Sequence, residues 1–171
     1  SPDFLCLSKG LTGGFLPMSA VLTTDDIFNG FLSSDRSRGF LHSHSYTGNP
    51  LGCAAALASL AIFNDDHIIE RNRNTAALIQ QHMANLNLHP NVANLRQTGM
   101  IAAFDLVQTN HEPFPEAQRC GLKAYRAGLE RGAVLRPLGD TLYWMPPYCI
   151  QDEELQFLAD VTLNSIEKAC A

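Results

Sequence analysis

The stretch FLCLSKGLTGGFLPMSAVLTT, residues 4–24, decides how this chain is interpreted. Its apolar start, residues 4–7, predicts a buried strand, and Lys9 follows at the beginning of a turn rich in glycine. Glycines let the backbone approach a ligand closely, and an amine that loses its hydration becomes a nucleophile able to form Schiff bases. The alternative is a lysine that extends from a strand end into water.

Composition limits the classes of function that the chain can have. With 171 residues, 46% of them hydrophobic, it can bury a core as one domain or two small ones. A formal net charge of -5 and the absence of any Lys- or Arg-rich run argue against nucleic acid or an anionic membrane as a partner. No apolar run approaches the roughly 20 residues that span a bilayer, and the N-terminus lacks the order of a signal peptide.

The five cysteines are an odd number, are widely spaced and form no CxxC pair. This pattern predicts reduced thiols in apolar surroundings in a cytoplasmic protein, and it supports no metal site. His42 and His44 lack cysteine or carboxylate neighbours at ligand spacing, so loop or interface roles are favoured for them over metal binding.

Periodicity predicts an α/β-like first part, 1–64, and a small α+β second part, 65–171, with a boundary near Asn64. Strands are expected near 4–7 and 18–22, a short helix near Thr24, which can cap it, and a buried helix from Pro50 with Asn49 as its N-cap. The second part is expected to contain an amphipathic helix over 68–86, strands near 92–97, 100–107, 134–136 and 142–145, and helices over 116–131 and from Asp152.

The segment HSHSYTGNPLGCAAALASL, residues 42–60, carries hydroxyls just ahead of the helix that Pro50 begins. Free backbone N–H groups at a helix N-terminus bind anions, so Ser45 and the backbone of 47–49 are candidates to hold a phosphate. The alternative is a capped loop whose hydroxyls only satisfy backbone groups.

The segment VLRPLGDTLYWMPPYCI, residues 134–150, places Arg136 at the end of an apolar run. A guanidinium among apolar residues needs a carboxylate as its ion-pair partner. Asp140 or Glu130 of the same chain could provide it, and so could a bound carboxylic acid.

Taken in order, SPDFLCLSKGLTGG, HSYTGNPLGCAAALASL and RPLGDTLYWMPPY resemble the class III aminotransferases, which are pyridoxal-phosphate enzymes of fold type I. The resemblance spans essentially the whole chain. It implies that residues 1–64 form the end of the large cofactor-binding domain and that residues 65–171 form the small C-terminal α+β domain. It also implies a cytoplasmic enzyme whose full-length form is a homodimer.

By this resemblance Lys9 forms the Schiff base with pyridoxal phosphate and moves a proton between substrate and cofactor. Ser45, where the family usually has threonine, reaches the cofactor phosphate from the neighbouring subunit of a dimer, and Tyr46 is a further cofactor-binding candidate. Arg136 matches the arginine that pairs with the carboxylate of a long-chain keto acid, with Tyr143 and Gly14 as further substrate-binding candidates.

The Arg136 segment is most typical of the members that act in biotin synthesis. They transfer an amino group to 8-amino-7-oxononanoate, most often from S-adenosylmethionine and in some members from lysine. Other ω-amino acid aminotransferases of the family stay an alternative.

The family's glycine-rich phosphate loop, stacking aromatic residue and pyridine-binding aspartate all precede the lysine, and none of them is found here. The chain is therefore expected to hold about the later half of an enzyme and to be inactive alone. The alternative from another class is a non-catalytic C-terminal module that uses the residues from Asp65 onward for dimerisation or interaction.

Overall fold

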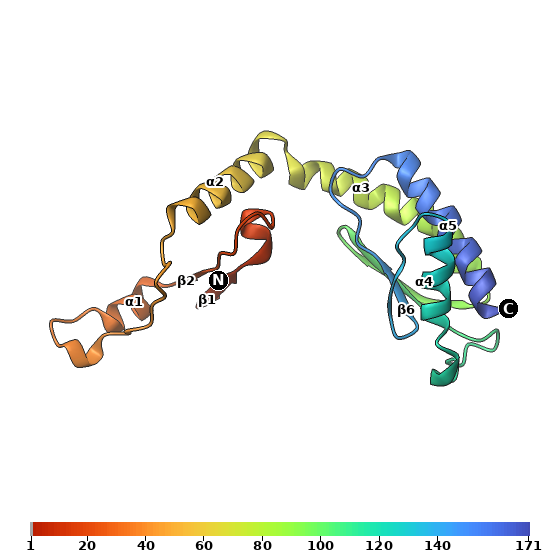
Figure 1. Ribbon diagram of the computed structural model, residues 1–171, viewed down its shortest axis with the longest axis horizontal. Coiled ribbons are helices and arrows are strands. Elements are labelled where there is room, and N and C mark those ends of the chain that lie inside the picture. The colour runs from red at the N-terminus through yellow and green to blue at the C-terminus, as the bar shows by residue number, and fades with distance from the viewer. Residues whose placement is uncertain (1) are drawn as a thin grey trace. The chain divides into compact units, whose positions relative to one another are not determined.

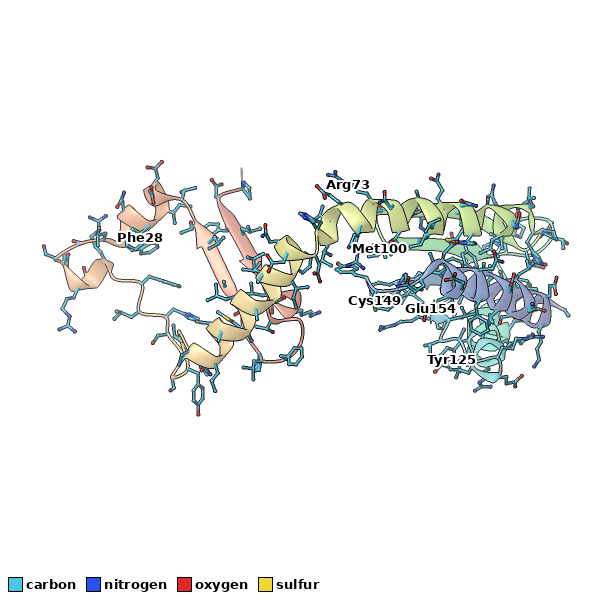
Figure 2. All side chains as sticks on the ribbon, turned by 90° about the horizontal axis from the view of Figure 1, so that it is seen from above. Phe28, Arg73, Met100, Tyr125, Cys149 and Glu154 are labelled. Atoms are coloured by element: carbon cyan, nitrogen blue, oxygen red, sulfur yellow. The ribbon has the colours of Figure 1, made fainter. Side chains whose placement is uncertain are left out.

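The structure is a computed structural model, and it describes residues 2–171. The chain divides into two compact units, the first ending at Ile68 and the second comprising Ile69–Ala171. The boundary predicted near Asn64 falls in the last turn of the helix α2, Pro50–Asp65. Figure 2 shows the side chains of both units, with Phe28 labelled in the first and Tyr125 in the second.

The first unit contains a two-stranded antiparallel sheet and two helices (Figure 1). The strands β1, Phe4–Leu7, and β2, Ala20–Thr23, are connected by the 3-10 helix η1, Lys9–Thr12, and its glycine turn. The helix α1, Asp25–Phe31, the short 3-10 helix η2, Arg36–Arg38, and α2 follow.

Both predicted caps in this unit are confirmed. The Thr24 hydroxyl accepts a hydrogen bond from the Ile27 amide, and the Asn49 side chain accepts one from the Leu51 amide. Each side chain satisfies an amide that has no partner inside its helix, which is why these residue types begin helices.

The predicted burial of this unit is wrong for the chain as described. Phe4 and Leu5 of β1 are 57% and 45% exposed, and along α2 only Gly52 and Ala56 are buried. The apolar content of these elements predicted that they lie in a core, but a side chain is buried only where a second layer of structure packs against it. In residues 2–68, β1 pairs only with β2, and α2 contacts mainly η1.

The second unit is an α+β fold with its own core (Figure 1). Its four strands lie in the order β3-β4-β6-β5, and all neighbours are antiparallel. The elements are α3 (Ile68–Met83), η3 (Ala84–Leu88), β3 (Val92–Thr98), β4 (Ile101–Leu106), η4 (Glu116–Gln118), α4 (Cys120–Glu130), β5 (Arg136–Leu138), β6 (Thr141–Trp144) and α5 (Asp152–Cys170).

One face of this sheet carries the core and the other is open. Phe104 and Leu142, on β4 and β6, are buried together with Ile79 of α3 and Leu155 of α5. Since successive strand residues point to opposite faces, Tyr143, next to Leu142, lies on the open face. Figure 1 shows α4 and α5 side by side, and they pack against each other.

Two predicted elements of this unit differ from the structure. The helix expected over 116–131 is broken, because Arg119 adopts a left-handed conformation with φ 48° and separates η4 from α4. The strand expected over 134–136 begins instead at Arg136 and includes Pro137. This proline is tolerated because β5 is an edge strand of the sheet.

All five cysteines are free thiols, but they do not all lie in the core. Cys120 is buried, whereas Cys6 and Cys149 are exposed. Burial raises the pKa of the half-buried Cys170 thiol to about 11, and the nearby Cys120 acts in the same direction. Within residues 2–171, no helix is long and apolar enough to cross a bilayer.

Candidate active site

Lys9 occupies a conformation that few residues with a side chain adopt. Its φ is 43°, and it begins η1, which ends at Gly13 with φ 60° and is followed by Gly14 with φ 84°. A left-handed conformation costs a residue with a Cβ roughly 1–3 kcal/mol, and such strain gathers at functional sites. The turn therefore holds the Lys9 amine directly ahead of Gly10 at an energetic cost.

The backbone of this turn is held from two sides. The Thr12 side chain is buried and donates a hydrogen bond to the carbonyl oxygen of Leu16 at 2.6 Å. From α2, the hydroxyl of Ser59 donates to the carbonyl oxygen of Gly10 at 3.4 Å. The turn is thus held by residues that do not use the Lys9 amine.

The Lys9 side chain itself is exposed, so the expected loss of hydration is not provided by this unit. The expectation came from the apolar run before it, and that run is itself exposed here. Full burial of the amine would need atoms that the described residues do not place around it.

The segment ahead of α2 forms a tight hydrogen-bonded turn. The Thr47 amide donates to the carbonyl oxygen of His44 at 2.9 Å, and the Asn49 amide donates to that of Tyr46 at 3.0 Å. The side chains of Ser45 and Tyr46 are exposed, and within the described chain the Ser45 hydroxyl makes no hydrogen bond. Of the Ser45 and Thr47 hydroxyls, Ser45 is therefore the one free to bind an anion, since the Thr47 hydroxyl already accepts a hydrogen bond from the His44 amide at 3.0 Å.

Arg136 lies on the open face of the second unit's sheet, directly across from Tyr143 in the β5–β6 register. Its guanidinium carbon is 5.9 Å from the centroid of the Tyr143 ring, within the range of a cation–π contact. The side chain is exposed, and no ion pair of Arg136 occurs among residues 2–171.

Both carboxylates considered as internal partners for Arg136 are engaged elsewhere. Glu130 pairs with Lys168, at 2.5 Å between Oε2 and Nζ, and the hydrogen bond from that lysine lowers the Glu130 pKa. Asp140 accepts a hydrogen bond from the Gly121 amide at 2.7 Å. This leaves Arg136 available for a carboxylate from outside the described chain.

A polar cluster around Asp105 ties together three strands beside this site. The Asp105 carboxylate accepts hydrogen bonds from Asn94 at 2.9 Å, from Arg96 at 3.1 Å and from Thr141 at 2.7 Å. Partial burial raises the Asp105 pKa, but the bonds from Asn94 and Thr141 and the charge of Arg96 outweigh it, so the pKa lies below its usual range. Asn94, with φ 52°, forms the β3 bulge that directs these donors at Asp105.

The Asp105 cluster predicts a dependence of stability on pH. A carboxyl whose folded pKa is depressed stabilises the fold above its unfolded pKa of about 3.9, and this stability is lost as the pH falls through the folded pKa. We expect Asp105→Asn to lower the melting temperature at pH 7, and the difference from the wild type to shrink as the pH falls below about 4.

Thermal unfolding followed by circular dichroism at several pH values measures this difference, with Asp160→Asn as the matched control at an exposed carboxylate on α5. A difference that stays constant over the whole range would contradict the role of the Asp105 charge.

The predicted site residues thus fall into two groups. Lys9 and Gly14 share one turn, and Ser45 and Tyr46 share another, both in the first unit, while the second unit brings Arg136 and Tyr143 together. No group of three or more potential metal ligands occurs in the described part of the chain.

The donor set fits pyridoxal phosphate in its chemistry. A primary amine held in a glycine turn suits an aldehyde, and an exposed serine hydroxyl ahead of a helix N-terminus suits a phosphate. At Gly14, an added Cβ would meet nothing within 4 Å, so there is open space beside the lysine turn.

The chain belongs to the class III aminotransferase family, whose model matches residues 1–169. It is 40% identical over 171 residues to the adenosylmethionine-8-amino-7-oxononanoate aminotransferase of Aquifex aeolicus, covering 98% of this chain and 38% of that protein. With the enzyme of the same name from Synechococcus elongatus it shares 46% identity over 158 residues, covering 91% of this chain and 35% of the relative.

Solved structures agree with this assignment. The enzyme of that name from Methanocaldococcus jannaschii superposes with a TM-score of 0.92 at 37% identity, covering 100% of this chain and 40% of that one. An (S)-enantioselective omega-transaminase from Thermomicrobium roseum gives a TM-score of 0.90 at 28% identity, covering 100% of this chain and 38% of the other. The fold is that of the pyridoxal-phosphate-dependent transaminases, and the chain spans well under half the length of these relatives.

Proposed function

We propose that this chain provides the Schiff-base lysine and the substrate-binding arginine of an aminotransferase that converts 8-amino-7-oxononanoate into 7,8-diaminononanoate in biotin synthesis. The observation that carries the proposal is the strained, left-handed Lys9 in a glycine turn, in a chain 40% identical to an enzyme of that name. The backbone strain at Lys9 is explained if it holds the amine at a defined position for reaction with the cofactor aldehyde.

Pyridoxal phosphate, when bound, supplies the electron sink that makes the carbon next to the nitrogen acidic. Lys9 would hold the cofactor through its Nζ, and the free Nζ would be the base that accepts and returns the proton at that carbon. The Ser45 hydroxyl would donate a hydrogen bond to the phosphate from the neighbouring subunit of the proposed dimer, and Tyr46 is proposed as a second residue that holds the cofactor.

Arg136, with Tyr143 against its guanidinium, is proposed to bind the carboxylate of the nine-carbon keto acid. In the first unit, Gly14 is proposed as a further substrate-binding residue because it leaves open space in the turn of Lys9. The unpaired state of Arg136 among residues 2–171 supports this role, because an exposed guanidinium without an ion pair can form a bidentate pair with an incoming carboxylate.

The amino donor is proposed to be S-adenosylmethionine, as the names of the relatives indicate, with lysine as the alternative. The active protein is proposed to be a cytoplasmic homodimer. The first unit exposes many apolar side chains, such as Phe15 at 87% and Leu41 at 90%, on which further protein can pack, and the proposed second subunit is one source of it.

Cofactor attachment tests the proposal directly. The chain is mixed with pyridoxal phosphate, reduced with borohydride and freed of excess reagent, and the adduct is located by intact mass and peptide mapping. A single adduct on Lys9, together with a visible absorption band before reduction, is the expected result. Equal labelling of Lys9, Lys123 and Lys168 would contradict a built site.

Substrate assays of the enzyme that contains this chain separate the remaining possibilities. Transfer from S-adenosylmethionine to 8-amino-7-oxononanoate supports the proposed reaction, whereas transfer only from ornithine or aminobutyrate would assign another ω-amino acid aminotransferase. A non-catalytic module is the second candidate, and one observation favours it: all members of the hydrophobic core cluster lie in the second unit. Absence of both adduct and transfer would support that module.

A further inference from the structure

The helix α4 begins without a cap from its own sequence. Arg119 occupies the N-cap position with φ 48°, and its side chain makes no capping hydrogen bond. Instead, Oδ1 of Asp140 accepts a hydrogen bond from the Gly121 amide at 2.7 Å. A carboxylate at this place satisfies a free amide and also faces the positive end of the helix dipole. The cap of α4 therefore comes from the β5–β6 turn.

This contact leaves no space for a side chain. A Cβ added to Gly121 would lie 2.2 Å from the carbonyl oxygen of Gly139 and 3.2 Å from the Cα of Asp140. Both neighbours are backbone atoms, so neither can move without moving the turn. Gly139 has φ 62° in the first loop position of a two-residue hairpin, the position at which a type II′ turn requires glycine.

Asp140 also joins the turn to the sheet. Its carbonyl oxygen accepts a hydrogen bond from the Leu106 amide at 2.9 Å, at the end of β4. One residue thus connects β4, the N-terminus of α4 and the β5–β6 turn. The turn is fixed on two sides, by its side chain and by its backbone.

The position of Arg136 depends on these two contacts of Asp140 more than the position of a residue on a central strand would. It lies on β5, which is an edge strand that pairs only with β6 in the described sheet and contacts α4. Leu138 pairs with Thr141 at the turn, and Arg136 pairs with Tyr143 further along the same short ladder. A shift of the turn is therefore carried along the hairpin to the guanidinium.

We propose that Asp140 is a positioning residue for Arg136: by capping α4 from the hairpin turn, it holds the edge strand β5 where the arginine can receive the substrate carboxylate. This inference rests on the proposed role of Arg136, and it assigns Asp140 a part in substrate affinity without contact to substrate.

The test compares Asp140→Ala with Asp140→Asn, which keeps an oxygen acceptor for the Gly121 amide. In the enzyme loaded with pyridoxal phosphate, Asp140→Ala is expected to raise KM for 8-amino-7-oxononanoate about fivefold, the effect of losing one helix cap, with kcat changed less than twofold. Asp140→Asn is expected to restore most of the affinity. Gly121→Ala, which displaces the turn from the helix side, is expected to act like Asp140→Ala, and Glu153→Ala on α5 is the control.

A second measurement needs no activity. In the 171-residue chain, we expect the ring current of Tyr143 to shift the Arg136 Nε–H resonance, because the guanidinium carbon lies 5.9 Å from the ring centroid. Asp140→Ala is expected to move this resonance toward its position in unfolded protein, while Asp140→Asn leaves it in place. Circular dichroism reports whether each variant is folded.

The kinetic and resonance measurements distinguish a failure of the proposed reaction from a failure of the positioning role of Asp140. A wild type without transfer activity but with the expected resonance shift would overturn the proposed reaction and keep the anchorage of Arg136. A folded Asp140→Ala with an unchanged Arg136 resonance would overturn the positioning role. An active enzyme whose KM does not change in Asp140→Ala would overturn it as well.

Discussion

Replacing Lys9 by alanine is expected to abolish the borohydride-trapped adduct and to reduce transamination by at least 10²–10⁴-fold, roughly the contribution of a general acid–base group. The loss of a covalent attachment point adds to this, because the same amine acts as nucleophile and as base. Intact mass before and after reduction, and single-turnover transfer with excess enzyme, measure the two effects separately.

Lys123→Ala is the matched control, since it removes another exposed lysine from a helix that the proposed chemistry does not use. The result that would contradict the role of Lys9 is a variant with an unchanged adduct and unchanged transfer. Folding is not expected to limit the experiment. The turn is held by Thr12 and Ser59, and Lys9→Ala leaves both hydrogen bonds in place.

Replacing Arg136 by alanine is expected to raise KM for the keto acid by roughly 30-fold to several thousand-fold. This range corresponds to the loss of about 2–5 kcal/mol when one partner of a paired charge is truncated. Arg136→Lys is expected to recover only part of the affinity, because an ammonium keeps the charge but cannot form the bidentate pair. Steady-state kinetics with the free acid and with its methyl ester measure the effect.

The methyl ester lacks the negative charge of the free acid, so comparing the two tests specifically whether Arg136 binds the carboxylate. The wild type is expected to bind the ester far more weakly than the acid, whereas Arg136→Ala is expected to discriminate little between them. Arg126→Ala, an exposed arginine on α4, serves as the control. If the variant retained full preference for the free acid, another group would be binding the carboxylate.

Much of the local structure could be predicted from the residues alone. Thr24 and Asn49 cap the helices that their side chains suggested, and in the acidic first turn of α5 the Glu154 carboxylate accepts a hydrogen bond from the Gln151 amide. Such features depend on neighbours within a few positions, so pattern and side-chain chemistry are sufficient to find them.

Burial could not be predicted in the same way. The apolar runs of β1 and α2 indicated a core, yet their side chains are exposed in the described chain, because burial depends on which layers come to lie against an element. The division between two units has the same cause. The second unit has a sheet and three helices that close around Phe104, whereas the first has no comparable layer within residues 2–68.

The candidate site shows the same limit. Lys9, Ser45 and Arg136 could be singled out by residue type and by their place next to glycines, a helix start and an apolar run. Asp105 was missed, although a lone carboxylate in the alternating strand AAFDLV was a signal that it needed donors on a neighbouring strand. Asp140 was considered only as a partner of Arg136, because its true partner, the Gly121 amide, is brought to it by the fold.

By itself, then, the sequence determined the family, the lysine that we propose as reactive, the order of most elements and several of their caps, since these follow from residue chemistry and local spacing. The tertiary structure alone decided that Arg136 has no carboxylate partner among residues 2–171, that Asp105 links three strands and that Asp140 caps α4. Each of these depends on contacts between residues far apart in the chain, and such contacts are set by how sheet and helices pack together rather than by any neighbouring residue.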